Sequence, residues 1–225
     1  MPPDSFQIRT CLSCGLRYPL ANENVFGTRC PVCLGETNLT LQAGREAGSE
    51  PEPSRISNRS AQSDLESPKR IGEFAVLLDN VRSAWNVGSI FRSADGFGFT
   101  RAYVCGITPT PDNDAVMKTS LGAENTVTWS YHKDAVKLVS GLRKEGWQVW
   151  ALEEHERAVP LSPYPNSPPE TPIVLILGNE VTGVDPGLLY LADTIFHIPM
   201  QGEKTSFNVA IAFGIAAYQL TAVRS

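Results

Sequence analysis

Two groups of residues in this sequence have types and spacings that could do chemistry. Four of the five cysteines form the pairs CLSC (Cys11, Cys14) and CPVC (Cys30, Cys33), with fifteen residues between the pairs. Two such pairs at this separation are typical of a tetrahedral zinc site made of four thiolates. A disulfide framework is the alternative, but disulfides are rare in a reducing cytosol. We therefore expect the four cysteines to bind a structural Zn2+ ion, without which so short a segment would not fold.

The second group surrounds Arg92. The stretch NVGSIFRSADGFG begins at Asn86, follows the apolar run FAVLL, and carries its apolar residues at helical spacing. Asn86 is expected to cap this helix, and Arg92 lies just off its apolar face. Because Asp79, Asn80 and Arg82 precede the helix, polar groups gather at a strand-to-helix junction, where α/β proteins place chemistry. A surface or salt-bridge role is the alternative for the arginine taken alone.

Composition limits the fold and the class of protein. A chain of 225 residues with 42 % hydrophobic residues can bury one α/β core and carry a small appendage. The formal net charge of −5 argues against a broad, non-specific nucleic-acid binder, although it allows a local basic patch. The sequence lacks a run of eighteen apolar residues, and its start, MPPDSFQIRT, lacks the apolar core of a signal peptide. We expect a cytoplasmic protein that does not associate with a membrane.

The chain divides into three parts. Residues 1–41 hold the cysteine pairs and are expected to form a zinc-ribbon-like module. Residues 42–70 are rich in Gly, Ser, Pro, Glu and Arg and nearly free of large apolar residues, which predicts a flexible linker. Its basic residues could contact phosphates, but the acidic residues between them favour a solvated tether. Residues 71–225 form the main domain.

Strands and helices alternate beyond residue 70. Continuous apolar runs such as IVLIL predict an α/β fold, with a mostly parallel sheet covered by helices on both faces. Residues 160–172 hold six prolines, so a loop is expected there, more as a plain surface excursion than as a lid. Cys105 is expected to be a core residue. Strands are expected at 73–80, 101–107, 125–132, 148–154, 173–179 and 194–200, and helices at 87–97, 133–144 and 207–223.

Three blocks together carry a resemblance to a known family. They are NVGSIFRSADGFG, LILGNEVTGV at residues 175–184, and IPMQGEKTSFNVAIAFGIAAY at residues 198–218. No G-x-G-x-x-G follows the first strand, which disfavours a dinucleotide-binding Rossmann enzyme. In order and spacing, the blocks resemble the SpoU (TrmH) family of SPOUT RNA methyltransferases over about residues 72–222.

The resemblance implies a homodimeric enzyme that transfers a methyl group from S-adenosylmethionine to a ribose 2′-hydroxyl of tRNA or rRNA. It also implies a deep trefoil knot near the C-terminus, which composition and periodicity do not indicate and which the general rule against knots would reject. In the family, backbone groups of the second and third blocks hold the cofactor. The matching positions are Gly178, Ile198 and Phe207, with Leu177, Asn179, Met200 and Gln201 close by. Phe207 replaces the leucine that is usual in the family.

Arg92 matches the catalytic arginine of the family. A guanidinium has a pKa above about 12 and is a poor base, so it is better suited to bind the target phosphate and to stabilise the developing alkoxide. The resemblance implies that Asn86 orients Arg92 or the ribose, and that Glu180 fixes Arg92 or a backbone turn. Ser206 and Asn208 match the polar pair of the third block, although capping of the last helix, with Ser206 as the N-cap, explains them almost as well.

Several alternatives stay open on the sequence alone. A catalytically inactive SPOUT protein that binds RNA or protein is one, and an α/β hydrolase is another, although no G-x-S-x-G motif supports it. The zinc module could recognise RNA through Arg9, Arg17 and Arg29, or it could be a docking or stabilising module. Arg82 and Lys204 are either phosphate contacts or solvated residues. A structural role is expected for His132, His155 and His197.

Overall fold

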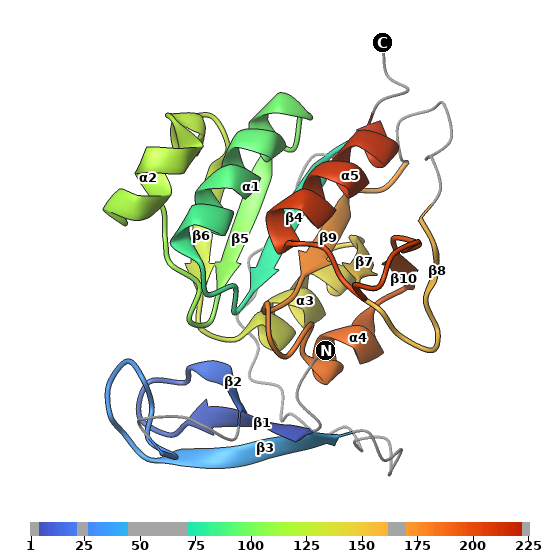
Figure 1. Ribbon diagram of the computed structural model, residues 1–225. Helices are drawn as coiled ribbons and strands as arrows, with labels where there is room; N and C mark the ends of the chain where they lie inside the picture. The colour runs from blue at the N-terminus through green and yellow to red at the C-terminus, as the bar shows by residue number, and fades with distance from the viewer. Residues whose placement is uncertain (1–4, 22–26, 45–71, 162–169, 222–225) are drawn as a thin grey trace.

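A seven-stranded parallel sheet forms the centre of the molecule (Figure 1). The computed structural model describes residues 5–21, 27–44, 72–161 and 170–221. The strand order is β6-β5-β4-β9-β7-β10-β8, and every pairing is parallel. The strands are β4 (Phe74–Asp79), β5 (Arg101–Cys105), β6 (Thr128–His132), β7 (Gln148–Leu152), β8 (Val159–Pro160), β9 (Ile173–Leu177) and β10 (Thr194–His197).

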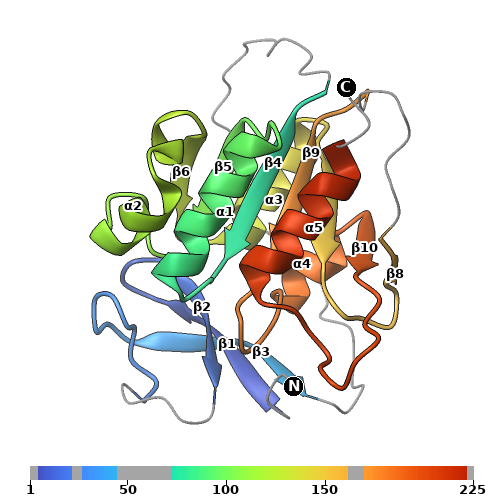
Figure 2. The same cartoon turned by 45° about the horizontal axis from the view of Figure 1, so that its top comes forward.

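Helices cover both faces of this sheet, as Figure 2 shows. The helices are α1 (Ala84–Gly96), α2 (Asp114–Ser120), α3 (Ala135–Lys144), α4 (Pro186–Leu191) and α5 (Val209–Thr221), with a short 3-10 helix at Ala123–Asn125. Side chains of β4 alternate between two apolar clusters: Phe74, Val76 and Leu78 pack with α1 and α5, whereas Ala75 and Leu77 pack with α3 and α4. The fully buried β4 and β9 explain their continuous apolar sequences, and the predicted α/β fold is confirmed.

Two predicted helix caps are wrong. Ser83, and not Asn86, caps α1, because its hydroxyl accepts the amide hydrogen of Asn86 and the helix begins three residues earlier than the apolar pattern suggests. Asn208, and not Ser206, caps α5, since its Oδ1 accepts from the amide of Ala210 at 2.9 Å. Asn86 and Ser206 are therefore not helix caps, whereas Asn208 is one. The short helices α2 and α4 were not predicted.

Other expected segments differ in extent or lie outside the described residues. Pro160 belongs to β8, which pairs with β10, so the proline-rich loop begins after it. Residues 162–169 of that loop and residues 45–71 of the expected linker lie outside the described residues. None of the helices in the described ranges is long and apolar enough to cross a membrane.

The cysteine-rich segment forms a separate three-stranded antiparallel sheet. Its order is β2-β1-β3, made of β1 (Ser5–Cys11), β2 (Arg17–Ala21) and β3 (Thr37–Gly44). The last strand continues beyond residue 41, where the module was expected to end. A small apolar cluster that includes Leu16, Tyr18 and Leu20 fills the space beside the buried Cys11 and Cys30.

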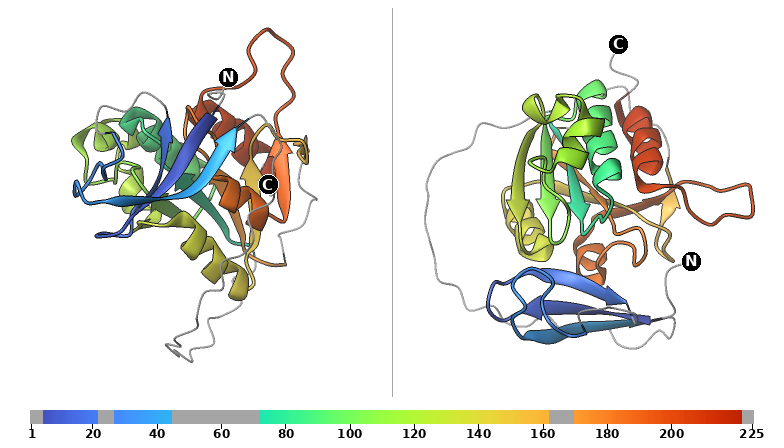
Figure 3. Two further views of the ribbon diagram at one scale, coloured as in Figure 1. Left: turned by 90° about the horizontal axis from the view of Figure 1, so that it is seen from below. Right: turned by 60° about the vertical axis from the view of Figure 1, so that its left-hand side comes forward.

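The zinc module packs against the end of the parallel sheet at which β4, β5 and β6 terminate (Figure 3). The Arg17 amide donates to the carbonyl of Lys133, and Ile107 packs against the apolar cluster of the module. The Arg17 guanidinium forms a bidentate ion pair with Asp185. Arg17 is therefore a docking residue and is not free to contact RNA, whereas Arg29 is exposed.

Asp79 makes the stability of this interface depend on pH. Burial and the nearby Asp185 carboxylate raise the pKa of Asp79 to about 7, against the lowering effect of hydrogen bonds and of Arg17. An acid with a raised pKa stabilises the fold fully below its unfolded value, and this contribution is lost as the pH rises through about 7. We expect Asp79→Asn to remove this slope, so that the variant gains up to about 4 kcal/mol over the wild type between pH 4 and pH 8. Urea unfolding of both proteins across this range measures the difference, and parallel curves would contradict the prediction.

Candidate functional site

The four cysteines of the N-terminal module converge. Their sulfur atoms all lie within 4.8 Å of one another, with Cys11 and Cys33 3.4 Å apart and Cys14 and Cys30 3.8 Å apart. A tetrahedron of thiolates at about 2.3 Å from Zn2+ has sulfur–sulfur edges of about 3.8 Å, so this donor set fits the ion. The amide of Cys14 donates to the Cys11 sulfur and lowers the pKa of that thiol to about 6, which favours the thiolate.

The two cysteine turns have the same backbone construction. In each, the residue after the second cysteine has a positive φ: Gly15 at 75° and Leu34 at 58°. Each of these amides donates to the carbonyl of the first cysteine of its pair, Cys11 or Cys30. The two matching turns bring the sulfurs of both pairs together, as expected of a structural zinc site.

A cavity of about 500 Å3 opens beside the carboxyl ends of β9, β7 and β10. Its wall is made by the loop after β9, the end of β7 and the segment that leads from β10 into α5. The lining mixes apolar side chains, among them Leu177, Ile198 and Phe207, with polar groups. A cavity of this size and composition is suited to a nucleoside-sized ligand.

Glu180 ties the first block of the sequence to this cavity. Its carboxylate accepts hydrogen bonds from the amides of Arg82 (2.8 Å) and Ser83 (3.1 Å) and from the Asn86 side chain (3.0 Å). Burial raises the pKa of Glu180, but these donors outweigh burial and lower it, so the group is ionised at neutral pH. Glu180 thus fixes a backbone turn, one of the two roles expected for it, and holds the start of α1.

Asn86 joins all three blocks. Besides donating to Glu180, it accepts a hydrogen bond from the side chain of Asn208 at 3.1 Å. The segments that meet here are 94 and 122 residues apart in the sequence. Asn86 therefore orients Glu180 and Asn208, and among the described residues no hydrogen bond joins its side chain to Arg92. This network fixes the mouth of the cavity against α1 and α5.

The loop of residues 178–185 is held from both sides. The Asn179 side chain accepts from the amides of Val181 and Thr182 and donates to the carbonyl of Asn80 at 2.7 Å. Glu153, at the end of β7, accepts from the Val184 amide at 2.8 Å. Burial raises the pKa of Glu153, although this hydrogen bond opposes the shift.

We expect Gly178→Ala to destabilise the protein by about 3 kcal/mol, because a Cβ at this position would overlap the backbone of Gly183 and Val184, which no side-chain rotation can relieve. Gly141→Ala in α3 is the matched control: its Cβ meets nothing within 4 Å, and alanine favours a helix. Urea unfolding of the two variants tests this. Equal stability of the two variants would mean that the 178–185 loop can shift to accommodate the added methyl group at little cost in free energy.

Most predicted site residues meet at the cavity. Among those expected to bind the cofactor, only Gln201 is absent from the lining, and it is exposed. Arg92 lies on α1, is exposed, and makes no hydrogen bond or ion pair with any residue that the structure describes. The predicted residues that line the cavity are Leu177, Gly178, Asn179, Glu180, Ile198, Met200, Ser206, Phe207 and Asn208.

Sequence reasoning missed one wall of the cavity. Leu152, Glu153 and Glu154 at the end of β7 line it, as does His197, to which a structural role was assigned. The His197 ring lies 3.5 Å from the Glu154 carboxylate. One sequence signal could have indicated this wall: two glutamates directly follow the apolar strand QVWAL. The carboxyl ends of parallel strands lie at one edge of the sheet, where ligands bind.

Comparison with known proteins decides the family. A family model described as the SpoU rRNA Methylase family matches residues 73–218, which include all three blocks. The chain belongs to the SpoU rRNA methylase family. This SpoU-family chain is 29 % identical over 153 residues to a tRNA (guanosine(18)-2′-O)-methyltransferase from Thermus thermophilus, with 67 % of the chain and 75 % of the relative covered. It is also 29 % identical over 145 residues to a 23S rRNA (guanosine(2553)-2′-O)-methyltransferase from Bacillus subtilis, with 64 % of the chain and 56 % of the relative covered.

Solved structures of other SpoU proteins have the same fold as this SpoU-family chain. The SpoU methyltransferase AviRb from Streptomyces viridochromogenes, solved with the cofactor AdoMet, superposes with a TM-score of 0.61 at 25 % identity, over 70 % of this chain and 62 % of that one. The TrmH/SpoU tRNA modifying enzyme of A. aeolicus superposes with a TM-score of 0.60 at 27 % identity, over 69 % and 77 %. The residues that the family model matches, 73–218, leave out the zinc module.

Proposed function

We propose that this protein transfers a methyl group from S-adenosylmethionine to a ribose 2′-hydroxyl of tRNA or rRNA in the cytoplasm. The observation that carries the proposal is the cavity made by the second and third SpoU blocks, whose mouth the hydrogen bonds of Asn86 join to the first block. Relatives that carry out this reaction on tRNA and on rRNA support it.

The cavity has walls that fit the proposed cofactor. Leu152, Leu177 and Ile198 supply apolar surface for a purine and a thioether chain, and the cavity volume lies within the range for small-molecule sites. Phe207 is half exposed at the rim, where its ring is placed to stack on a base. When bound, the cofactor supplies an electrophilic methyl group on a sulfonium.

The chain's own residues position the acceptor and stabilise charge. Glu180, Asn86 and Asn208 hold α1 at a fixed place beside the cavity. The exposed guanidinium of Arg92, which pairs with no residue of the described ranges, is placed to bind the RNA phosphate next to the target and to stabilise the oxyanion as the 2′-hydroxyl loses its proton. Ser206, at the cavity wall, is placed to contact the ribose or the cofactor.

The homodimer and the deep trefoil knot expected from the family are part of this proposal. Exposed apolar side chains on α5, Ile211 and Tyr218, and Trp85 on α1 support self-association, since such residues are normally covered. Light scattering of the purified protein tests the dimer. A monomer at micromolar concentration would contradict it.

The function is tested with the zinc-loaded full chain, S-adenosylmethionine carrying a labelled methyl group, and separate pools of unmodified tRNA and rRNA. The proposal expects label in a dinucleotide that resists alkaline cleavage at its 3′ side, because a methylated 2′-oxygen cannot attack the phosphate. S-adenosylhomocysteine should compete. Cofactor binding without transfer to either pool would favour the catalytically inactive alternative, and absence of cofactor binding would overturn the proposal.

A further inference from the structure

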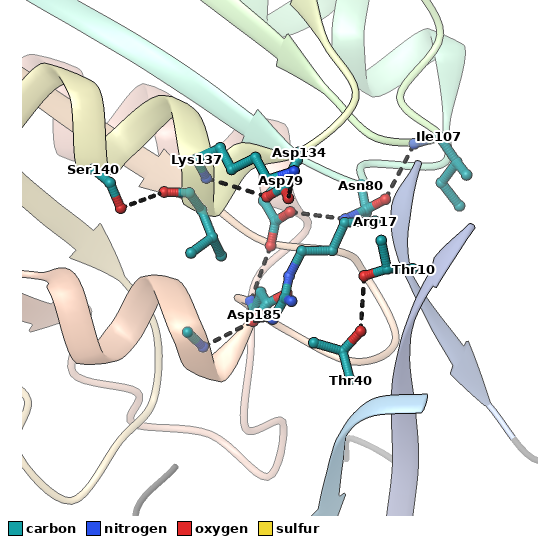
Figure 4. A network of polar contacts seen from close by, with 12 residues as sticks. Thr10, Arg17, Thr40, Asp79, Asn80, Ile107, Asp134, Lys137, Ser140 and Asp185 are labelled. Carbon is teal, nitrogen blue, oxygen red and sulfur yellow. Dashed lines mark hydrogen bonds and ion pairs between the residues drawn. The ribbon is translucent and has the colours of Figure 1, made fainter. Parts of the chain in front are cut away.

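Arg17 reaches from the zinc module into the main domain, behind the loop that lines the cavity (Figure 4). Its Nε and Nη2 donate to the two carboxylate oxygens of Asp185 at 2.7 and 2.9 Å. The arginine side chain is 11 % exposed and that of Asp185 3 % exposed, so this pair is almost completely removed from water. An arginine fork on a carboxylate combines charge with a fixed geometry.

Asp185 has a second carboxylate beside it. Asp79 accepts a hydrogen bond from the Asp185 amide at 2.9 Å, and both aspartates are buried. Two acidic groups in one buried site repel each other and are poorly solvated, so a positive charge is needed to hold them. Arg17 supplies that charge from a different part of the chain. Asp134, at the start of α3, also lies close enough to interact with the arginine.

The aspartate pair is connected to both ends of the 178–185 loop. Asp185 ends the loop and accepts from the Gly187 amide, which starts α4. Asp79 accepts from the Asn80 side chain at 2.8 Å, and the Asn80 carbonyl accepts from Asn179 at the other end of the loop. Asn179 itself lines the cavity. The loop that forms one cavity wall is therefore anchored on a site that Arg17 completes.

We propose that Arg17 is a positioning residue for the cofactor site: its bidentate ion pair with Asp185, beside the buried Asp79, fixes the 178–185 loop, so that the zinc module is a structural part of the cavity. The identity of the ligand as S-adenosylmethionine rests on the function proposed above. The assignment gives the module a second role beside any contact it makes with RNA. On this proposal, zinc binding by the four cysteines and cofactor binding in the cavity are coupled. Because such coupling is reciprocal, a bound cofactor should also strengthen zinc binding.

The test compares zinc-loaded full-length wild type with Arg17→Met and with Arg9→Met. Among the residues that the structure describes, the Arg9 side chain forms hydrogen bonds only within the module, with Gln7 and Thr37, so its replacement is the matched control for loss of a module arginine. Zinc content, cofactor affinity by calorimetry and amide hydrogen exchange of residues 179–187 are measured. We expect Arg17→Met to keep its zinc, to bind S-adenosylmethionine about tenfold more weakly, within the range of coupling between linked sites, and to exchange faster at Gly183, Val184 and Asp185. Arg9→Met should match the wild type.

Two further variants separate positioning from a loss of folding. Arg17→Lys keeps the charge without the fork and should recover part of the affinity. Asp185→Asn combined with Arg17→Met removes both members of the ion pair and should bind more tightly than Arg17→Met alone, because the Asp185 carboxylate is no longer buried without its cation. A residue that merely fastens the module would show no recovery in the double variant, because a methionine and an asparagine cannot restore the ion pair that links the module to the main domain.

Unchanged exchange and unchanged affinity in zinc-loaded Arg17→Met would overturn the inference. If the wild type does not bind S-adenosylmethionine at all, the proposed function fails, and exchange at residues 179–187 still decides whether Arg17 positions the loop. If Arg17→Met does not fold, the same comparison is made with Arg17→Lys, for which exchange and affinity equal to wild type in the absence of the fork would also count against the inference.

Discussion

Arg92→Ala is expected to lower the rate of RNA methylation about 100- to 1000-fold, the usual effect of removing one group that stabilises a developing oxyanion. The exposed guanidinium forms no hydrogen bond or ion pair with any described residue, so its loss should leave the free energy of unfolding nearly unchanged. Cofactor affinity should also stay the same, because Arg92 does not line the cavity. Single-turnover transfer to a responsive RNA, together with calorimetry, measures both quantities.

Arg92→Lys serves as the control for charge. A lysine keeps one positive charge but loses the planar fork, so an intermediate rate is expected if the residue binds a phosphate and an oxyanion together. Full activity of the alanine variant would remove Arg92 from the catalytic machinery. A parallel loss of cofactor affinity would instead indicate that the substitution disturbs the site.

Removal of zinc is expected to unfold the N-terminal module while the parallel sheet stays folded. The module has a core of only a few apolar side chains, and structural zinc supplies about 10–16 kcal/mol in small metal-dependent folds. A chelator, or Cys30→Ser, should therefore abolish protection of the amides of β1, β2 and β3 against hydrogen exchange. Zinc release is followed with a colorimetric indicator.

Cys105→Ser is the matched control for the cysteine substitutions. Cys105 is a buried thiol in β5, and burial raises its pKa well above the usual value, so it stays protonated. The control should retain the metal and the module. A module that withstands the chelator but unfolds when treated with dithiothreitol would indicate disulfides in place of zinc.

Local patterns made much of the molecule predictable. The continuous apolar sequences of β4 and β9 show that both faces of those strands are buried. The four cysteines were found because two residues separate the members of each pair, which is a short-range signal. The cap of α1 was misplaced because Ser83 and Asn86 are both good N-cap residues, and only the backbone geometry distinguishes them.

Contacts between distant segments could not be read from local patterns. Nothing near Asn86 indicates that it meets Glu180 and Asn208, and only the family resemblance grouped these residues. For Arg17 the sequence left RNA contact and docking both open, because an arginine beside a zinc knuckle has no local sign of its buried partner. Glu153 and His197 were missed for the same reason, since the sheet order that places β7 beside β9 and β10 beside β7 is a property of the whole chain.

The ion pair of Arg17 and Asp185 imposes an order on folding during synthesis. The two residues are 168 positions apart, so a ribosome adding 5–20 residues per second makes the aspartate roughly 10 to 30 s after the arginine. The N-terminal metal module can acquire zinc and fold within that interval, because all four cysteines have been made by residue 33. It then waits as a free, folded unit until β9 and α4 emerge. Synthesis of this chain in a zinc-poor cell would leave Arg17 without a fixed backbone when its partner appears, and the aspartates would be buried without a counter-ion.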